Sequence, residues 1–288
     1  MIKKGIILAG GMGTRMSPLT KAVNKQLLPL YDKPLIFYPL SILMLAGIKD
    51  ILIIVNKGQL NQFQKILPQN NYLGIKIRYK EQSKPRGLPD AFILGEKFIG
   101  KDNVALILGD NFFYGQSFSE KLKKCVNLKN GATIFVHPVK KPNLYGVAKI
   151  NNKNKVEKIV EKPKKYLSNL AVTGLYFFDN KVVKFSKTLK PSLRKEIEIT
   201  DLLNIYRKNM KLKAEMLGRG GVWLDTGSIE DFYSASNFIS TIENRQGFKI
   251  ACIEEISLKN NWIKYKEIKK QIIFYGNCQY SKYLKNLI

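Results

Sequence analysis

Residues 4–15, KGIILAGGMGTR, decide the fold, because an apolar run leads directly into three glycines and an arginine. A continuous apolar run predicts a strand that is covered on both faces. Gly10, Gly11 and Gly13 let the backbone turn and come close to a ligand. Their spacing matches neither the dinucleotide pattern G-x-G-x-x-G nor the Walker pattern G-x-x-x-x-G-K-[ST], so the loop must be interpreted from its surroundings.

Two cations follow the glycines. Arg15 ends the loop, and Lys25 lies ten residues later in NKQLLPL. Backbone N–H groups at a strand end can approach a polyphosphate, while arginine and lysine neutralise its oxygens. The alternative is a plain glycine turn with surface cations. The combined order G-G-x-G-T-R, then P-x-T, then K-x-L-x-P favours an anion-binding loop.

Further apolar runs alternate with helical patterns along the first half of the chain. DILIIVN (50–56) and VALILGD (104–110) predict buried strands, and Pro34 is predicted to open a helix that Gly47 ends. Helices are also predicted over 87–99 and over 228–247, the latter with Ser228 as N-cap. This alternation indicates an α/β fold with a mixed, mostly parallel central sheet flanked by helices.

The pattern changes from residue 131. GATIFVHPV, YGVAKI, KVEKIVEK and AVTGLYFF predict four strands with little helix between them, which favours an antiparallel flap on the main sheet. Residues 249–288 are less periodic and are predicted to end in a helix.

Cysteine content and hydropathy limit the class of protein. The three cysteines, Cys125, Cys252 and Cys278, lie far apart without C-x-x-C spacing, which argues against a disulfide framework or a cysteine zinc site. No apolar run is long enough to span a bilayer. We therefore expect a cytoplasmic protein without a membrane partner.

The formal charge of +27 raises the possibility of a nucleic-acid partner. Lysine supplies nearly all of the excess, and the lysines are scattered rather than gathered on one stripe. No RNA-binding sheet motif, zinc finger or helix-turn-helix pattern is present. The composition favours a solvated surface over a specific nucleic-acid face.

Two aspartates stand where apolar runs end. Asp110 lies in LILGDN and Asp225 in VWLDTG. Each alone could cap a turn, but strand-end carboxylates beside a phosphate-binding loop suit Mg²⁺. His137, the only histidine, lies beside proline in a strand pattern. It is interpreted as a packed residue, so a histidine-based mechanism has little support.

Residues 8–48 resemble the signature of sugar-1-phosphate nucleotidyltransferases. KQLLP followed by YDKPLIFYPLSILMLAGI is similar to the glucose-1-phosphate thymidylyltransferase branch. Further motifs recur in that family's order: LILGDNFFYG, YGVAKI, VEKP, AVTGLYFFD, EIEITDLLNIY and GRGGVWLDTGS. The resemblance therefore covers almost the whole chain.

The resemblance implies a Rossmann-like nucleotidyltransferase fold and transfer from dTTP to α-D-glucose 1-phosphate, giving dTDP-glucose and pyrophosphate. It also implies a homotetramer, with Asp110 and Asp225 holding Mg²⁺. We expect a nucleotidyltransferase domain over 1–247, with a nucleotide half at about 1–130 and a sugar-binding half at about 131–247. Residues 248–288 would pack on the same domain or on a neighbouring subunit.

The resemblance also assigns site residues. Arg15, Lys25 and Lys162 are the expected catalytic cations, and Gln82 is expected to pair with the edge of a pyrimidine. The nucleotide set comprises Leu8, Gly10, Gly11, Gly13, Thr14, Arg15, Lys25, Gln26, Gln82, Pro85, Gly87 and Asp110. The sugar-phosphate set comprises Asn111, Tyr145, Gly146, Glu161, Lys162, Val172 and Gly174.

One segment departs from the branch. Where thymidylyltransferases commonly have Ser-Pro-Asp-Gly-Leu-Ala-Gln, this chain has Lys-Pro-Arg-Gly-Leu-Pro-Asp at 84–90. UTP or another hexose 1-phosphate thus remains an alternative. An alternative of another class is a basic nucleic-acid-binding protein on an inactive scaffold. Arg219 and the tail from Phe248 match regions that, in the resembling family, form a subunit interface and a second nucleotide site. The resemblance therefore implies feedback inhibition by dTDP-rhamnose.

Overall fold

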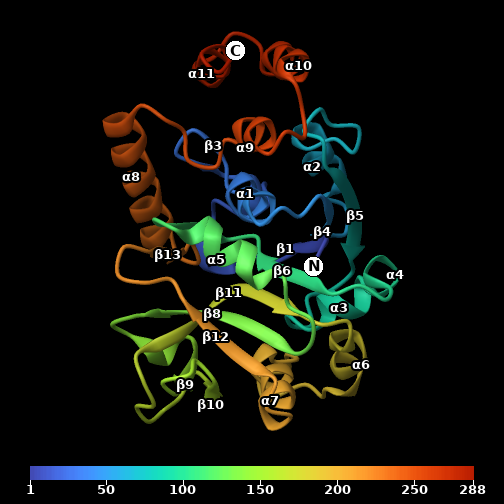
Figure 1. The fold of residues 1–288 in the computed structure, drawn as a ribbon, viewed down its shortest axis with the longest axis vertical. Coiled ribbons are helices and arrows are strands. Elements are labelled where there is room, and N and C mark those ends of the chain that lie inside the picture. The colour runs from blue at the N-terminus through green and yellow to red at the C-terminus, as the bar shows by residue number, and fades with distance from the viewer.

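The first apolar run forms β1 (Lys4–Ala9), an interior strand of the nine-stranded sheet in the computed structural model, which describes residues 1–288 (Figure 1). The sheet runs β10-β9-β11-β6-β1-β4-β5, with β8 between β11 and β12. Strands β6, β1, β4 and β5 are parallel, with Ile7 level with Ile53 on β4 and Ile107 on β6. The α/β fold with a parallel centre is confirmed.

The remaining strands are β2 (Pro29–Leu30), β3 (Lys33–Pro34), β4 (Asp50–Asn56), β5 (Lys76–Gln82), β6 (Val104–Leu108), β7 (Asn111–Tyr114), β8 (Ala132–Pro138), β9 (Gly146–Ile150), β10 (Val156–Glu161), β11 (Leu170–Phe178), β12 (Leu212–Met216) and β13 (Val222–Asp225).

The helices are α1 (Phe37–Leu45), α2 (Leu60–Ile66), α3 (Asp90–Leu94), α4 (Glu96–Ile99), α5 (Phe118–Cys125), α6 (Lys181–Thr188), α7 (Ile199–Lys208), α8 (Ile229–Gln246), α9 (Ile253–Lys259), α10 (Tyr265–Tyr275) and α11 (Gln279–Lys285). Short 3₁₀ turns are η1 (Thr14–Met16), η2 (Lys25–Leu27) and η3 (Pro142–Leu144).

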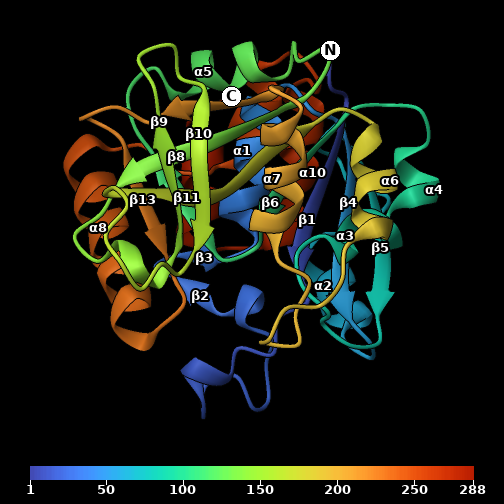
Figure 2. The same cartoon turned by 90° about the horizontal axis from the view of Figure 1, so that it is seen from below.

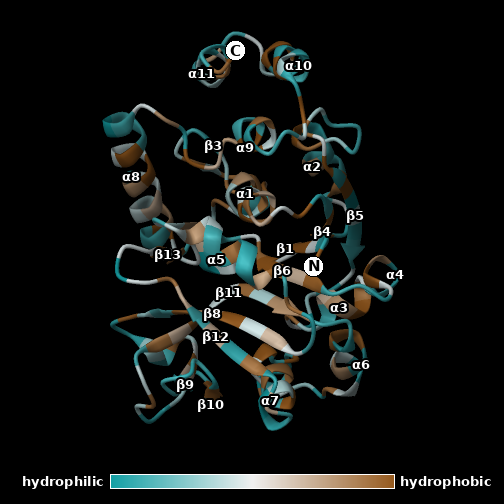
Figure 3. Cartoon of the chain, viewed as in Figure 1, coloured by the Kyte–Doolittle hydropathy of each residue, from teal (hydrophilic) through white to brown (hydrophobic).

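Helices cover both faces of the central sheet. Ile7 belongs to an apolar cluster with residues of α1, α5 and α9, whereas its neighbour Ile6 belongs to a second cluster with residues of α3, α6 and α7. Figure 3 shows the resulting brown, apolar centre beneath helices with mixed surfaces. Because successive strand residues point to opposite faces, this double cover explains why the central strands are continuously apolar.

The predicted antiparallel strands continue the same sheet. β11 pairs antiparallel with β6 and β8, and β9 joins β11 to the outer strand β10. The separate ribbon β7–β13 is also antiparallel. Figure 2 shows the blue loop after β1 beyond the end of the sheet. The predicted flap is confirmed as an extension of the main sheet.

Three predicted boundaries are wrong. Pro34 lies in the β2–β3 hairpin and α1 begins at Phe37, because the amides of Leu35 and Ile36 bond back to Leu28 O (3.0 Å) and Gln26 O (2.9 Å). The single helix expected over 87–99 is two short helices that meet at Gly95. The strand expected over 104–110 ends at Leu108.

Helix α8 follows its sequence signals. The Ser228 side chain accepts from the Asp231 amide at 3.1 Å, and Gly247 ends the helix with φ 72°. Beyond it, the tail forms α9, α10 and α11, and α9 packs against α1. No helix is both long and apolar enough to cross a membrane.

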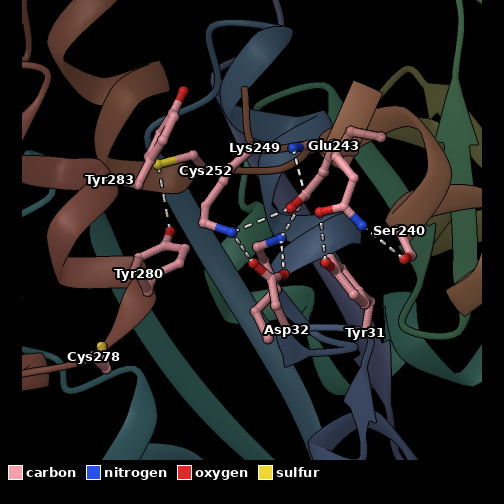
Figure 4. Close-up of polar contacts among 12 residues, drawn as sticks. Tyr31, Asp32, Ser240, Glu243, Lys249, Cys252, Cys278, Tyr280 and Tyr283 are labelled. Carbon is pink, nitrogen blue, oxygen red and sulfur yellow. Dashed lines mark hydrogen bonds and ion pairs between the residues drawn. The ribbon is translucent and has the colours of Figure 1, made fainter. Parts of the chain in front are cut away.

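A group of charges, which we call the hairpin cluster, fastens the tail to the β2–β3 hairpin (Figure 4). It consists of Asp32, Lys33, Glu243 and Lys249. Both lysines pair with Asp32, and Glu243 lies 3.0 Å from Lys33 Nζ and 3.2 Å from Lys249 Nζ. The Ile250 amide also donates to Glu243 at 2.8 Å. The cluster thus joins the hairpin to the end of α8 and the start of the tail, which lie 210 or more residues later in the sequence.

Candidate active site

The glycine loop leaves β1 and is anchored from outside through its carbonyl groups. Thr20 Oγ1 donates to Gly13 O at 2.8 Å, and Asn56 Nδ2 donates to Gly11 O at 3.3 Å. Gly13 has φ 60°, and a Cβ there would lie 2.9 Å from Thr20. The backbone N–H groups of residues 11–14, which include Thr14, donate to no acceptor within the chain. They remain available for an anion.

Strand β1 also supports the neighbouring turns. The Leu8 carbonyl accepts from the Gly109 amide at 2.9 Å, which fixes the turn before Asp110. Gln26, in η2, packs under this turn, and a Cβ on Gly109 would lie 2.9 Å from Gln26 Cγ. Gln26 Oε1 is buried without a hydrogen-bond partner. Sequence reasoning placed Leu8 and Gln26 at the nucleotide, and the structure places both beside the loop.

Lys25 and Asp110 meet at the carboxyl end of the sheet. Lys25 is buried, and its Nζ forms an ion pair with Asp110 Oδ2. Thr226 donates to the Asp110 carbonyl from its amide at 3.1 Å and from its hydroxyl at 2.8 Å. Burial raises the pKa of Asp110, but the Lys25 charge together with hydrogen bonds from Lys25 and Asn111 outweighs burial and holds that pKa below its usual value.

Asp225 reaches the same place from the other end of the chain. It ends β13, directly opposite Asn111 on β7, and therefore lies beside Asp110. Burial and then the negative charge of Asp110 raise the pKa of Asp225 to about 6, although Lys25 and Arg15 oppose the shift. Two carboxylates that disfavour each other's ionisation form a site that gains by binding a cation.

Arg15 lies at the edge of this group. A Cβ on Gly227 would lie 2.6 Å from Arg15 Nη2 and 3.1 Å from Asp225 Oδ1, so the guanidinium and the carboxylate flank the same glycine. No carboxylate forms an ion pair with Arg15. We call Arg15, Lys25, Asp110 and Asp225 the catalytic cluster.

Asn111 holds the Asp110 side chain of the catalytic cluster in place. Its Oδ1 accepts from Trp223 Nε1 at 2.6 Å and from the Gly174 amide at 3.0 Å, while its Nδ2 donates to Asp110 Oδ1 at 3.1 Å. A Cβ on Gly174 would lie 2.6 Å from Asn111 Oδ1. The assignment of Asn111 and Gly174 to the sugar phosphate stays a prediction; in the structure the two residues contact each other, and Asn111 also contacts Asp110.

Gln82 lies under the glycine loop at the end of β5. Its Nε2 donates to Gly10 O and, at 3.2 Å, to Asn56 Oδ1, and no group of the chain donates to its Oε1. A Cβ on Gly10 would overlap this amide at 1.9 Å. Because both neighbours are acceptors, the amide orientation is fixed, and only the carbonyl is free to meet a base.

The turn after Gln82 packs on a distant loop. Gly87, which follows Pro85 and Arg86, has φ 118°, and a Cβ there would lie 2.1 Å from Ile197 O. The Ile197 amide donates to Arg86 O at 2.8 Å. Only glycine fits this crossing, which joins the predicted base side to the loop before α7.

A cavity of about 450 Å³ opens beside the catalytic cluster. Its lining includes Arg15 and Asp225 together with five residues predicted for the sugar phosphate: Tyr145, Gly146, Glu161, Lys162 and Val172. The five residues come from three separate motifs, so the fold brings five of the seven predicted sugar-phosphate residues into one hollow; Asn111 and Gly174 lie outside this lining.

Two of them are held in defined positions. Lys162 follows β10 with φ 41°, in the left-handed region, and its amide donates to Tyr145 O at 3.0 Å. Burial raises the pKa of Glu161, although Arg194 opposes the shift with Nη2 at 3.3 Å from Glu161 Oε1. Because Lys162 is not a glycine, its left-handed backbone conformation needs support from its surroundings, which the hydrogen bond to Tyr145 O provides.

Sequence reasoning missed Arg194 and Glu198, which also line the cavity. Arg194 donates to Glu198 Oε1 from Nε at 3.0 Å and to Oε2 from Nη2 at 2.6 Å, while Ser192 Oγ donates to Oε1 at 2.7 Å. The available signal was the motif EIEIT, which places Glu198 before α7. His137, in contrast, lies on β8 outside this lining, and burial lowers its pKa.

Comparison with known proteins adds independent observations. The Nucleotidyl transferase family matches residues 4–242. A glucose-1-phosphate thymidylyltransferase of Neisseria meningitidis serogroup A is 49% identical over 285 residues, covering 99% of this chain and 99% of that protein. A protein of the same name from Xanthomonas campestris pv. campestris (strain B100) is 47% identical, with 99% and 97% covered.

A solved structure of a nucleotide-sugar enzyme is also similar to this chain. The crystal structure of a UDP-glucose pyrophosphorylase complexed with UDP-glucose matches with a TM-score of 0.73 and 29% sequence identity. The match covers 84% of this chain and 100% of that one.

Proposed function

This chain belongs to the Nucleotidyl transferase family and, within it, to the glucose-1-phosphate thymidylyltransferases, and on that premise we propose how its residues divide the reaction. dTTP and α-D-glucose 1-phosphate give dTDP-glucose and pyrophosphate. A nucleic-acid-binding role on an inactive scaffold is not favoured, because the family match extends over the whole catalytic region.

The reaction needs no protein nucleophile. A phosphate oxygen of glucose 1-phosphate attacks the α-phosphorus of dTTP in line, the bond from that phosphorus to the β-phosphate oxygen breaks, and pyrophosphate leaves with the electron pair. Both reactants are anionic at neutral pH. The chain must therefore align two anions and compensate their charge.

The catalytic cluster suits Mg²⁺, which one or two carboxylates hold together with phosphate oxygens and water. Asp110 and Asp225 supply the two carboxylates, and because burial and the charge of Asp110 raise the pKa of Asp225, a bound cation would favour its ionised form. No group of three His, Cys, Asp or Glu side chains is placed to hold a metal. Mg²⁺ would stabilise charge that develops on the phosphate oxygens.

The cations divide between the two substrates. The free amides of residues 11–14, with Arg15 and Lys25, are suited to hold the triphosphate and the leaving pyrophosphate. Lys162 and Arg194 line the cavity and are suited to orient the phosphate of glucose 1-phosphate. Glu161, also in this lining, has the acceptors that hexose hydroxyls require.

Base recognition falls to the free carbonyl of Gln82, which can accept the N3–H of thymine. Cytosine has an acceptor at that position, but uracil presents the same N3–H as thymine. Gln82 therefore accounts for rejection of cytosine nucleotides and not for preference of dTTP over UTP. We expect Gln82→Ala to narrow the dTTP-to-dCTP preference in kcat/KM about tenfold; an unchanged ratio would place base recognition elsewhere.

One observation carries the assignment of sites: three separate segments bring Arg15, Lys25, Asp110 and Asp225 together, and Arg15 and Asp225 line the cavity. The test is a product assay over dTTP, UTP and the other nucleoside triphosphates with several sugar 1-phosphates. We expect dTDP-glucose with Mg²⁺ and none after chelation. Activity that survives chelation would remove the metal role from the two aspartates.

We also propose a homotetramer with a second nucleotide site at the tail. A hollow of about 420 Å³ lies between α1, β7 and the tail, and Lys259 in its lining is suited to meet a phosphate. Light scattering tests the tetramer, and inhibition by dTDP-rhamnose tests the second site. A monomer would leave the active-site assignment intact.

A further inference from the structure

The turn that departs most from the thymidylyltransferase branch contains an ion pair of its own. Arg86 donates to Asp90 from Nη2 to Oδ1 at 2.8 Å and from Nε to Oδ2 at 3.3 Å. Both residues lie within the departing stretch 84–90. The two departures from the branch therefore belong together, because Arg86 and Asp90 form one ion pair.

The two partners differ sharply in exposure. The Arg86 side chain is 62% exposed, whereas the Asp90 side chain is 3% exposed and has no partner other than Arg86. A buried carboxylate without a counter-charge is strongly unfavourable. Asp90 therefore holds the guanidinium, and with it the backbone of Arg86, in one position. Two parallel bonds define that position better than one.

Arg86 lies between the two substrate sides of the active site. Four residues before it, Gln82 ends β5 under the glycine loop. The Arg86 carbonyl accepts from the Ile197 amide at 2.8 Å, and Ile197 lines the catalytic cavity between Glu196 and Glu198. Gly87, the next residue, crosses the same Ile197 backbone. Movement of Arg86 would disturb the base side and the sugar side together.

We propose that Arg86, held by Asp90, is a positioning residue that keeps the thymine-side turn and the sugar-side loop in one fixed arrangement. This inference rests on the proposed function of the site. Arg86 touches neither substrate in this role. Its loss is expected to weaken the binding of both substrates while the catalytic cluster, which lies on other segments, keeps its chemistry.

The test compares steady-state constants of Arg86→Ala, Asp90→Asn and Arg86→Lys with the parent enzyme. Arg86→Ala and Asp90→Asn should each raise KM for dTTP and for glucose 1-phosphate about fivefold, with kcat within about threefold of the parent. Arg86→Lys should recover part of the loss, because it keeps the charge but not the paired geometry. Melting temperatures show whether each variant is folded.

Arg78→Ala is the matched control, because Arg78 lies on the same strand as Gln82 and pairs with Asp50 with 55% of its side chain exposed. It should leave both KM values unchanged. If Arg86→Ala raises KM while Asp90→Asn does not, Arg86 meets the nucleotide directly and the positioning role is wrong. Lower melting temperatures with unchanged KM values would also overturn it. The parent's own turnover, measured first, tests the proposed function separately.

Discussion

The catalytic cluster and the hairpin cluster have the same composition, two cations and two carboxylates, but opposite arrangements. In the hairpin cluster both lysines pair with both carboxylates, so four contacts form a closed ring (Figure 4). In the catalytic cluster the only ion pair is Lys25 with Asp110. Arg15 and Asp225 are left for groups that come from outside the chain.

The pKa values of the carboxylates differ between the two clusters. Burial raises the pKa of Asp32, but Lys33 and Lys249 outweigh it and the pKa ends below its usual value. Burial and the charge of Asp110 instead raise the pKa of Asp225 to about 6. A charge cluster that completes its own pairing serves the fold, whereas one that leaves a carboxylate without an ion pair is a candidate binding site.

The largest expected effect comes from neutralising the catalytic carboxylates. Asp110→Asn and Asp225→Asn keep the side-chain size but remove the charge that holds Mg²⁺, so each should cut kcat at least about a hundredfold. Steady-state kinetics at several Mg²⁺ concentrations measures this. The control is Asp102→Asn, whose parent side chain is 61% exposed and pairs with Lys4. Near-parental turnover at limiting Mg²⁺ would remove the metal role from that aspartate.

The hairpin cluster should respond in stability. Lys33→Met removes a cation whose side chain is 1% exposed and leaves Asp32 and Glu243 to share Lys249. Because one cation remains, we expect a loss of about 2 kcal/mol in the free energy of unfolding, below the usual value for a broken buried pair. Urea unfolding measures it. Lys187→Met, at an exposed pair with Glu96, should lose less than about 0.5 kcal/mol; equal losses would contradict the comparison.

The pH dependence of turnover at limiting Mg²⁺ should report the catalytic cluster. Asp225 must be ionised to hold Mg²⁺, and its pKa is about 6. At limiting Mg²⁺, turnover should therefore fall about tenfold for each pH unit well below 6. Saturating Mg²⁺ should move this fall to lower pH, because the metal competes with the proton. A profile that does not respond to Mg²⁺ would assign the fall to another group.

Local patterns predicted much of the fold. Continuous apolar runs identified β4 with its bounds, and Ser228 and Gly247 identified both ends of α8. Pro34 misled because its preference for a helix start was overridden by hydrogen bonds from Leu35 and Ile36 to the preceding turn. Hydrogen bonds to a neighbouring turn cannot be recognised from the spacing of apolar residues in a helix.

The site was predictable where one motif supplies one residue. Arg15, Lys162 and Asp225 each stand in a recognisable motif, and all three line the cavity. The ion pair between Arg194 and Glu198 was missed because a charged residue in a loop is usually solvated. The hairpin cluster was missed because Lys33 and Glu243 meet only after folding, 210 positions apart in the sequence.

The smallest expected effect tests the sign of the comparison directly. At Asp225 the folded pKa, about 6, exceeds the unfolded value of about 3.9. Between those values the folded state binds more protons, so rising pH removes stability, and above about pH 6 the ionised carboxylate opposes folding. At Asp32 the folded pKa is lowered, so its contribution is present above the unfolded value and is lost as pH falls through the folded one. At pH 7.5 we therefore expect Asp225→Asn to raise the melting temperature and Asp32→Asn to lower it, each by about 2 °C. At pH 5 the gain from Asp225→Asn should shrink, because the parent carboxyl is then largely protonated. Calorimetry of both variants and the parent at the two pH values measures the shifts without substrate or metal. Shifts of the same sign at pH 7.5 would mean that the two clusters do not differ in the way their ion pairs indicate.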